Sequence, residues 1–372
     1  MEPETRATSF EKDAHKTKDN APKTKTRNRR GLDFKDLDQD FPDEYYEILF
    51  NDLYTEIFSL VHSAFLPGGK PAVTQTSPWL REYPEEFLRY VELVAHPNTR
   101  AGQWDLLLRD GNERVNLLTA IIFRVLDRKV FSSLLFGAGG MHDETLEKSD
   151  TALIIAEGFQ RSSLRSHTTR TWLRTSTSNG EPPRFWEEVD ELCNRMVAML
   201  LPIYAYANDI TSSKSTHSLK LYQSLHDVIA YAGWLSVLVR LSPAIVSIDW
   251  TAPGDRYSMG QANSCHDAYV NSKVAIIRQD MDSGEFEARS RQVMSAARVK
   301  ISVTPKIVRH KPVPKTVAAR GVTSYTIMKP HVVYYQGYRL EKEEKQAFIS
   351  LPDYIKQLRD RNCVPLNIAT LL

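Results

Sequence analysis

Cysteine is scarce in this sequence, with Cys193, Cys265 and Cys363 the only three among 372 residues. They lie far apart and are odd in number, which argues against a disulfide framework and is typical of a reducing compartment. A chain of this length can bury a sizeable core without cross-links. The class of small, disulfide-rich secreted proteins is therefore excluded.

Long apolar runs are also lacking. The first twenty residues are polar, so they do not predict the hydrophobic part of a secretory signal. Residues 228–248 have the length of a membrane span, but Arg240 and Pro243 interrupt them. We predict a buried helix that ends near Pro243, and no membrane partner.

Familiar catalytic signatures are absent as well. The sequence has no phosphate-binding or dinucleotide-binding glycine motif, no zinc-type spacing of cysteine and histidine, and no serine nucleophile motif. Cys265, His266 and Asp267 are adjacent, but neighbours on a helix point in different directions, so they do not predict a triad. We predict no catalytic residue, no metal and no cofactor.

Acidic residues are missing from one long stretch. Residues 288–340 contain eleven Lys and Arg and no Asp or Glu. Residues 1–31 carry a net charge of +4, residues 32–287 carry −13, and residues 341–372 are neutral, so the whole chain carries only +2. This division predicts either a phosphate-facing surface or a basic segment that packs on the acidic part of the same chain.

The acid-free stretch supplies the candidate contacts to nucleic acid. Tyrosines between its basic residues suit base stacking, and they equally suit half-buried strands. The candidate contact residues are Arg298, Lys300, Lys306, Arg309, Lys311 and Lys315.

A second group of arginines lies in another stretch without acids. Arg161 and Arg165 are four residues apart, as are Arg170 and Arg174, so each pair can share one helix face. Paired guanidinium groups suit phosphate or carboxylate binding, and they equally suit a solvated face or ion pairs with acids elsewhere. An enzyme of unknown class with a pocket near Arg161, Arg165 and His266 is therefore one alternative.

The N-terminal basic cluster has a different interpretation. Residues 1–31 are low in apolar residues, and we predict a disordered basic tail that extends to residue 39. Without a secretory signal, such a cluster favours nuclear localisation through an import receptor. Its basic residues are Lys23, Lys25, Arg27, Arg29 and Arg30.

Helical spacing of apolar residues dominates the region after this tail. The predicted helices cover residues 43–65, 112–137, about 144–174, 184–207 and 216–243. Pro202 should kink or end the fourth of them.

The period changes after about residue 298, where β-branched and aromatic residues predict a hairpin or two extended arms. The predicted fold class is therefore mainly α. A large bundle-like helical domain would cover residues 40–287, a basic β or extended segment 288–340, and a helical tail 341–372.

One long motif resembles a known family. The run VLDRKVFSSLLFGAGG at residues 125–140, followed by EGFQRSSLR at 157–165, is similar to a fungal-restricted family of largely uncharacterised, mainly helical proteins. The pair Trp104-Asp105 precedes the run in the same pattern, and the likeness covers about residues 77–174 and, more moderately, the rest. Among such proteins the chain resembles nuclear factors that control colony and hyphal morphology and growth at low oxygen. The resemblance implies a regulatory role and supplies no active-site residue.

We therefore expect a non-enzymatic nuclear regulatory protein that affects gene expression and fungal colony or hyphal morphology under low oxygen. A nucleic-acid-binding protein that uses the acid-free basic segment is one alternative, and the enzyme is the other.

Overall fold

The computed structural model divides the chain into two units, Met1–Asp33 and Phe34–Leu372. All the helices and strands named below belong to the second unit. The described residues are 32–34, 40–66, 76–97, 103–152, 154, 158–176, 180–211, 218–265, 268–269, 294–313, 321–338 and 340–363.

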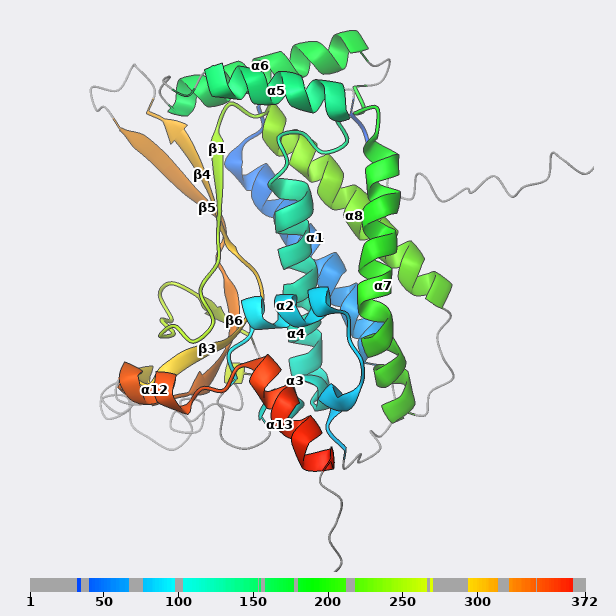
Figure 1. Cartoon of the computed structure of the whole chain (residues 1–372). Helices are drawn as coiled ribbons and strands as arrows, with labels where there is room; N and C mark the ends of the chain where they lie inside the picture. Colours follow the sequence, from blue (N-terminus) through cyan, green and yellow to red (C-terminus); the bar gives the residue numbers. More distant parts are fainter. Residues whose placement is uncertain are drawn as a thin grey trace, which may run out of the picture. The chain divides into compact units, whose positions relative to one another are not determined.

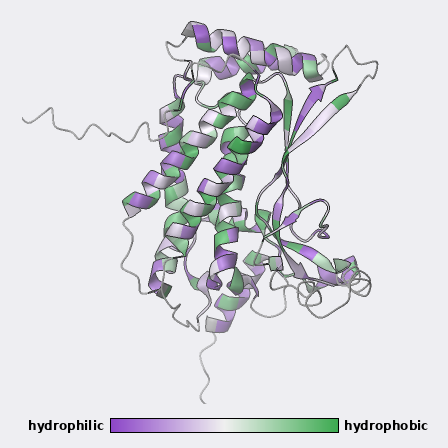
Figure 2. Cartoon of the chain, turned by 180° about the vertical axis from the view of Figure 1, so that it is seen from behind, coloured by the Kyte–Doolittle hydropathy of each residue, from purple (hydrophilic) through white to green (hydrophobic). Residues whose placement is uncertain are grey.

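Four long helices build the core of the second unit (Figure 1). They are α1 (Asp43–Phe65), α4 (Gly111–Leu126), α7 (Phe185–Thr211) and α8 (Ser218–Leu241). Leu49, Leu53 and Ile57 lie on the buried face of α1, as their helical spacing predicts. Most residues of α4 and α8 are buried, because each of these helices has neighbours on several sides. Figure 2 shows hydrophobic residues along the same helices, with hydrophilic residues between them.

Short helices cover one end of this core. They are the 3₁₀ turn η1 (Pro78–Leu80), α2 (Glu85–Val94) and α3 (Gln103–Arg109). Capping residues mark two helix starts in this region, those of η1 and α4. The Ser77 side chain accepts a hydrogen bond from Trp79 N at 3.3 Å, and Asp110 caps α4 by accepting from Glu113 N at 2.8 Å.

The middle of the chain departs from the prediction in three ways. The helix predicted over 112–137 ends at Leu126 and continues as a π-helical turn, η2 (Asp127–Phe131). The helix predicted over about 144–174 is two helices, α5 (Gly140–Ala152) and α6 (Gly158–Ser176), which pack side by side. Helix α7 continues through Pro202, so the predicted end of the helix at that residue is wrong, and the alternative of a kink stays a prediction.

Within the described residues, six strands form two three-stranded sheets. One sheet has the antiparallel order β1 (Ile245–Asp249), β4 (Lys306–Pro312), β5 (Val322–Met328). The other sheet has the strand order β2 (Asn263–Ser264), β6 (His331–Gln336), β3 (Ala297–Ser302). Strands within 297–336 agree with the predicted change of period. Strands β1 and β2 were not predicted, and they tie the acidic part of the sequence to the basic stretch.

Two helices end the described chain, α12 (Glu341–Ala347) and α13 (Leu351–Cys363). The mainly helical class is confirmed for the described residues. None of the described helices combines the length and the apolar character that a membrane span requires.

Candidate functional site

The basic residues of the acid-free stretch are largely internal. Arg309 on β4 has a fully buried side chain that pairs with Asp40 and Asp43. It donates to Asp43 Oδ1 at 2.6 Å and to the carbonyl oxygen of Phe41 at 3.0 Å. Its guanidinium carbon lies 4.3 Å from the ring centroid of Tyr46. A phosphate would have to displace two carboxylates and enter the core to reach this group.

Arg298 and Lys300 on β3 are buried in the same manner. Arg298 donates to the carbonyl oxygen of Gly254 at 2.9 Å, and its Nε lies 3.6 Å from Glu344 Oε2. The ammonium group of Lys300 pairs with Glu113. Burial of these side chains favours the alternative in which the basic stretch packs on the acidic part of the same chain.

The other residues predicted to bind nucleic acid or an import receptor either lie at least partly exposed or fall outside the described residues. Lys311 is partly exposed and pairs with Asp43 at 2.9 Å, whereas Lys306 is exposed on β4. The residues that lie outside the described ranges are Lys23, Lys25, Arg27, Arg29, Arg30, His266 and Lys315.

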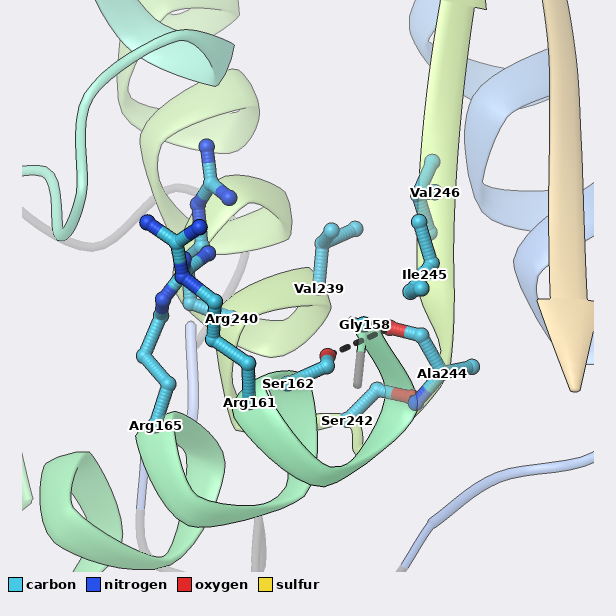
Figure 3. A pocket seen from close by; sticks show the side chains of 10 residues that line it. All are labelled: Gly158, Arg161, Ser162, Arg165, Val239, Arg240, Ser242, Ala244, Ile245 and Val246. Carbon is cyan, nitrogen blue, oxygen red and sulfur yellow. Dashed lines mark hydrogen bonds between the residues drawn. The ribbon is translucent and has the colours of Figure 1, made fainter. Parts of the chain in front are cut away.

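A cavity of about 320 Å³ lies between α6, the end of α8 and the start of β1 (Figure 3). Three arginines line it, Arg161 and Arg165 from α6 and Arg240 from α8. Figure 3 shows their guanidinium groups gathered on one side, opposite Val239 and Ile245. We call this cavity the arginine pocket.

The end of α8 follows from local chemistry. Pro243 has no N–H to continue the helix, and Ala244 N donates instead to the Ser242 hydroxyl at 3.1 Å. Arg170 of α6 donates to the carbonyl oxygen of Leu241 at 2.6 Å, which places a cation at the helix C-terminus. The chain then enters β1 directly, so α6, α8 and β1 meet at one point.

Arg161 and Arg165 share one face of α6, as their spacing predicts, and both pair with Asp150 of α5. Arg161 Nε donates to Asp150 Oδ1 at 2.9 Å. Hydrogen bonds from Arg161 and then Arg165 lower the pKa of Asp150 to about 2. The Asp150 side chain is 20% exposed, so solvent reaches this pair.

The π-helical turn η2 positions the Arg240 side chain through a hydrogen bond. Its Nη2 donates to the carbonyl oxygen of Phe131 at 2.6 Å, at the end of η2. Its Nε is buried and has no hydrogen-bond partner among the described residues. Burial, together with repulsion from Arg165, lowers the pKa of Arg240 to about 10, so the group is still charged at neutral pH.

The electrostatic balance of the arginine pocket is strongly positive. Among the described residues, Arg161 and Arg165 share one carboxylate, that of Asp150, so the three guanidinium groups keep an excess of two positive charges. The first turn of α6 contains no acidic residue to offset them. Oriented cations in a partly desolvated cavity bind anions.

The uncharged side of the pocket has few polar groups to offer. Ser162 Oγ makes only a long hydrogen bond of 3.3 Å to the carbonyl oxygen of Ala244, so it can turn toward a ligand. The Ser242 hydroxyl is already engaged, since it donates to Asp40 Oδ1 at 2.8 Å and accepts from Arg309 Nη2 at 2.8 Å. Val246 and Ile245 supply apolar surface.

Sequence reasoning found two of the three arginines and missed Arg240. The available signal was an arginine in an otherwise apolar, buried helix, because a buried cation needs partners. That signal does not identify the partner, which is set by the packing of α6 on α8.

Within the described ranges, no group of three or more His, Cys, Asp and Glu side chains could hold a metal ion. Comparisons of the chain with protein-family models, curated proteins and solved structures find no match.

Proposed function

We propose that this chain is a non-enzymatic regulatory protein that binds a small anionic ligand in the arginine pocket. One observation carries the proposal: three guanidinium groups line a cavity of about 320 Å³ whose described lining residues include no acidic side chain, and two of these groups pair with the carboxylate of Asp150. This volume is at the lower end of the range of about 300–1,000 Å³ that is usual for ligand pockets.

The chemistry of the pocket favours binding over catalysis. Arginine and serine side chains keep their protons near neutral pH, so they orient and stabilise an anion without exchanging protons. The nearby carboxylate of Asp150, with a pKa of about 2, is a poor base at neutral pH. The pocket thus offers no general acid or base matched to neutral pH.

Calorimetric titration of the full chain with inorganic phosphate and with citrate, at constant ionic strength, tests the proposal. Arg165→Gln should weaken binding by about tenfold or more, because a charge-assisted hydrogen bond is lost. Arg89→Gln is the matched control, since Arg89 also pairs with a carboxylate, Glu85 at 3.0 Å, but on the exposed face of α2. Absence of any anion binding, or equal weakening by both variants, would contradict the proposal.

The nuclear part of the proposal rests on the sequence. The basic residues Lys23, Lys25, Arg27, Arg29 and Arg30 would bind an import receptor. The resemblance to nuclear morphology factors supports a role in gene expression and in colony or hyphal form under low oxygen. Alanine replacement of the five residues in a fluorescent fusion should shift the protein from nucleus to cytoplasm, and an unchanged distribution would remove the cluster from the proposal.

A further inference from the structure

We infer that the ligand of the arginine pocket is a small phosphate monoester, whose phosphoryl group replaces the Asp150 carboxylate on Arg161 and Arg165. This inference rests on the proposed function and names the ligand class. It follows from three features of the pocket: the anion already present, the charge that remains, and the apolar wall.

The Asp150 carboxylate shows how an oxyanion is held here. Its Oδ1 accepts from Arg161 Nε, and its two oxygens are shared between the guanidinium groups of Arg161 and Arg165. Arg240 lines the same cavity as Arg161 and Arg165, so all three guanidinium groups border the space that an anion would enter. A planar carboxylate has two oxygens for them, whereas a phosphoryl group has three, one for each guanidinium.

The remaining charge distinguishes between classes of anion. A monocarboxylate that displaced Asp150 would exchange one negative charge for another and leave the excess of two positive charges unchanged. A phosphate monoester carries about −1.5 to −2 near neutral pH, so it neutralises more of the excess. A phosphodiester, as in nucleic acid, carries only one charge and one fewer free oxygen, so the pocket should discriminate against it.

The apolar wall sets the rest of the ligand. Val239, Ile245 and Val246 face the cavity opposite the guanidinium groups (Figure 3). Inorganic phosphate alone would leave this surface exposed to water, whereas a compact apolar substituent would cover it. Ser162, on the same turn as Arg161, can donate its hydroxyl hydrogen to an ester or phosphoryl oxygen once it leaves the carbonyl of Ala244.

The Asp150 side chain can be displaced from the two arginines because, among the described residues, α5 has few buried contacts. Its buried residues are His142 and Leu146, and the ring of His142 stacks on Trp172 of α6 with centroids 3.5 Å apart. The ion pairs of Asp150 lie at the far end of the helix from this stack. Displacement of Asp150 would therefore break its ion pairs with Arg161 and Arg165 and leave the stack of His142 on Trp172 in place.

Calorimetric titration of the unmodified full chain with a matched set of ligands tests the ligand class. The set is phenyl phosphate, its methyl diester, benzoate and a short single-stranded oligonucleotide. Phenyl phosphate should bind about tenfold tighter, or more, than the diester or benzoate, because it supplies extra charge-assisted hydrogen bonds. Equal binding of phenyl phosphate and benzoate, or preference for the diester or the oligonucleotide, would overturn the inference.

A variant of the competing carboxylate supplies the sharper test. Asp150→Asn removes the internal anion, so it should tighten phenyl phosphate binding by about tenfold, since the charged competitor is lost. Far-ultraviolet circular dichroism verifies the fold, and Asp150→Ser is a second variant if the first unfolds. Unchanged or weaker affinity in a folded variant would show that Asp150 does not occupy the ligand position.

The two levels of the proposal fail in different ways. If no anion binds the unmodified chain or the Asp150 variants, the proposed function itself is wrong. If inorganic phosphate and citrate bind, but phenyl phosphate has no advantage over benzoate, only the ligand class is wrong. Arg89→Gln should leave all of these affinities unchanged.

Discussion

Replacement of Arg309 by alanine should be among the most destabilising single substitutions in the sheet formed by β1, β4 and β5. The Arg309 side chain is fully buried, contacts Asp40 and Asp43, and lies over the ring of Tyr46. Its loss leaves two carboxylates, which are only 32% and 22% exposed, without their main cation.

The expected cost can be estimated from these contacts. Removal of one partner from a buried ion pair costs about 3–5 kcal/mol, because the charge left behind is poorly solvated. At about 2 °C per kcal/mol, this corresponds to a fall of about 6–10 °C in Tm. Thermal unfolding followed by circular dichroism, at neutral pH and moderate salt, measures it. The effect should change little with added salt, because buried pairs are weakly screened.

Lys306→Ala is the control for this prediction. Lys306 lies on the same strand and carries the same charge, but its side chain is exposed, so the change in stability should stay within about 0.5 kcal/mol. Comparable stability of Arg309→Ala and Lys306→Ala would refute the reasoning and return Arg309 to the list of residues available to an external phosphate.

Three further changes follow from other parts of the structure. Glu344→Ala should cost about 3–5 kcal/mol in the free energy of unfolding, because the buried Glu344 accepts a hydrogen bond from the Tyr335 hydroxyl at 2.5 Å and pairs with Arg298; Glu344→Gln, which keeps the acceptor, should cost less in the same denaturant titration. Burial lowers the pKa of His142 from 6.5 to about 4, so the unfolded chain binds a proton that the folded chain excludes; stability should fall as the pH drops from about 6.5 to about 4, and His142→Phe should flatten that part of the stability–pH curve. Gly137→Ala should cost about 1–3 kcal/mol in thermal unfolding, because Gly137 has a φ of +80° and a Cβ there would lie 2.6 Å from the Cα of Phe185.

The helices were predictable because their signals are local. Apolar residues at helical intervals identify α1 and α8, and Ser77 and Asp110 mark helix starts through their own side-chain oxygens. The π-helical turn after α4 was not predictable in this way. Its carbonyl groups are satisfied by side chains from α8, such as Ser236, which donates to Val130 O at 3.1 Å.

Strand β1 escaped prediction because its partner is remote. Residues 245–249 directly follow an apolar helix, and their pairing with β4 joins positions about sixty residues apart, such as Ile245 and His310. The same limit applies to the arginine pocket. The spacing of Arg161 and Arg165 fixes a shared helix face, but only the packing of α6 on α8 brings Arg240 to it.

The number of carboxylates that each arginine meets separates structural arginines from candidate binding arginines. The charge segregation along the sequence predicted either a phosphate-facing surface or a basic stretch that packs on the acidic part of the chain. Arg309 pairs with Asp40 and Asp43, more than 260 residues earlier in the sequence, which matches the second alternative. There Arg309 and Lys311 together meet the carboxylates of Asp40 and Asp43, so no positive charge remains to attract a ligand. In the arginine pocket the described residues give a different balance, since three guanidinium groups lie together and only Arg161 and Arg165 pair with a carboxylate, that of Asp150. Because like charges gathered beside a partly enclosed cavity repel one another, this excess is the basis of our proposal that an anion from outside the chain binds there.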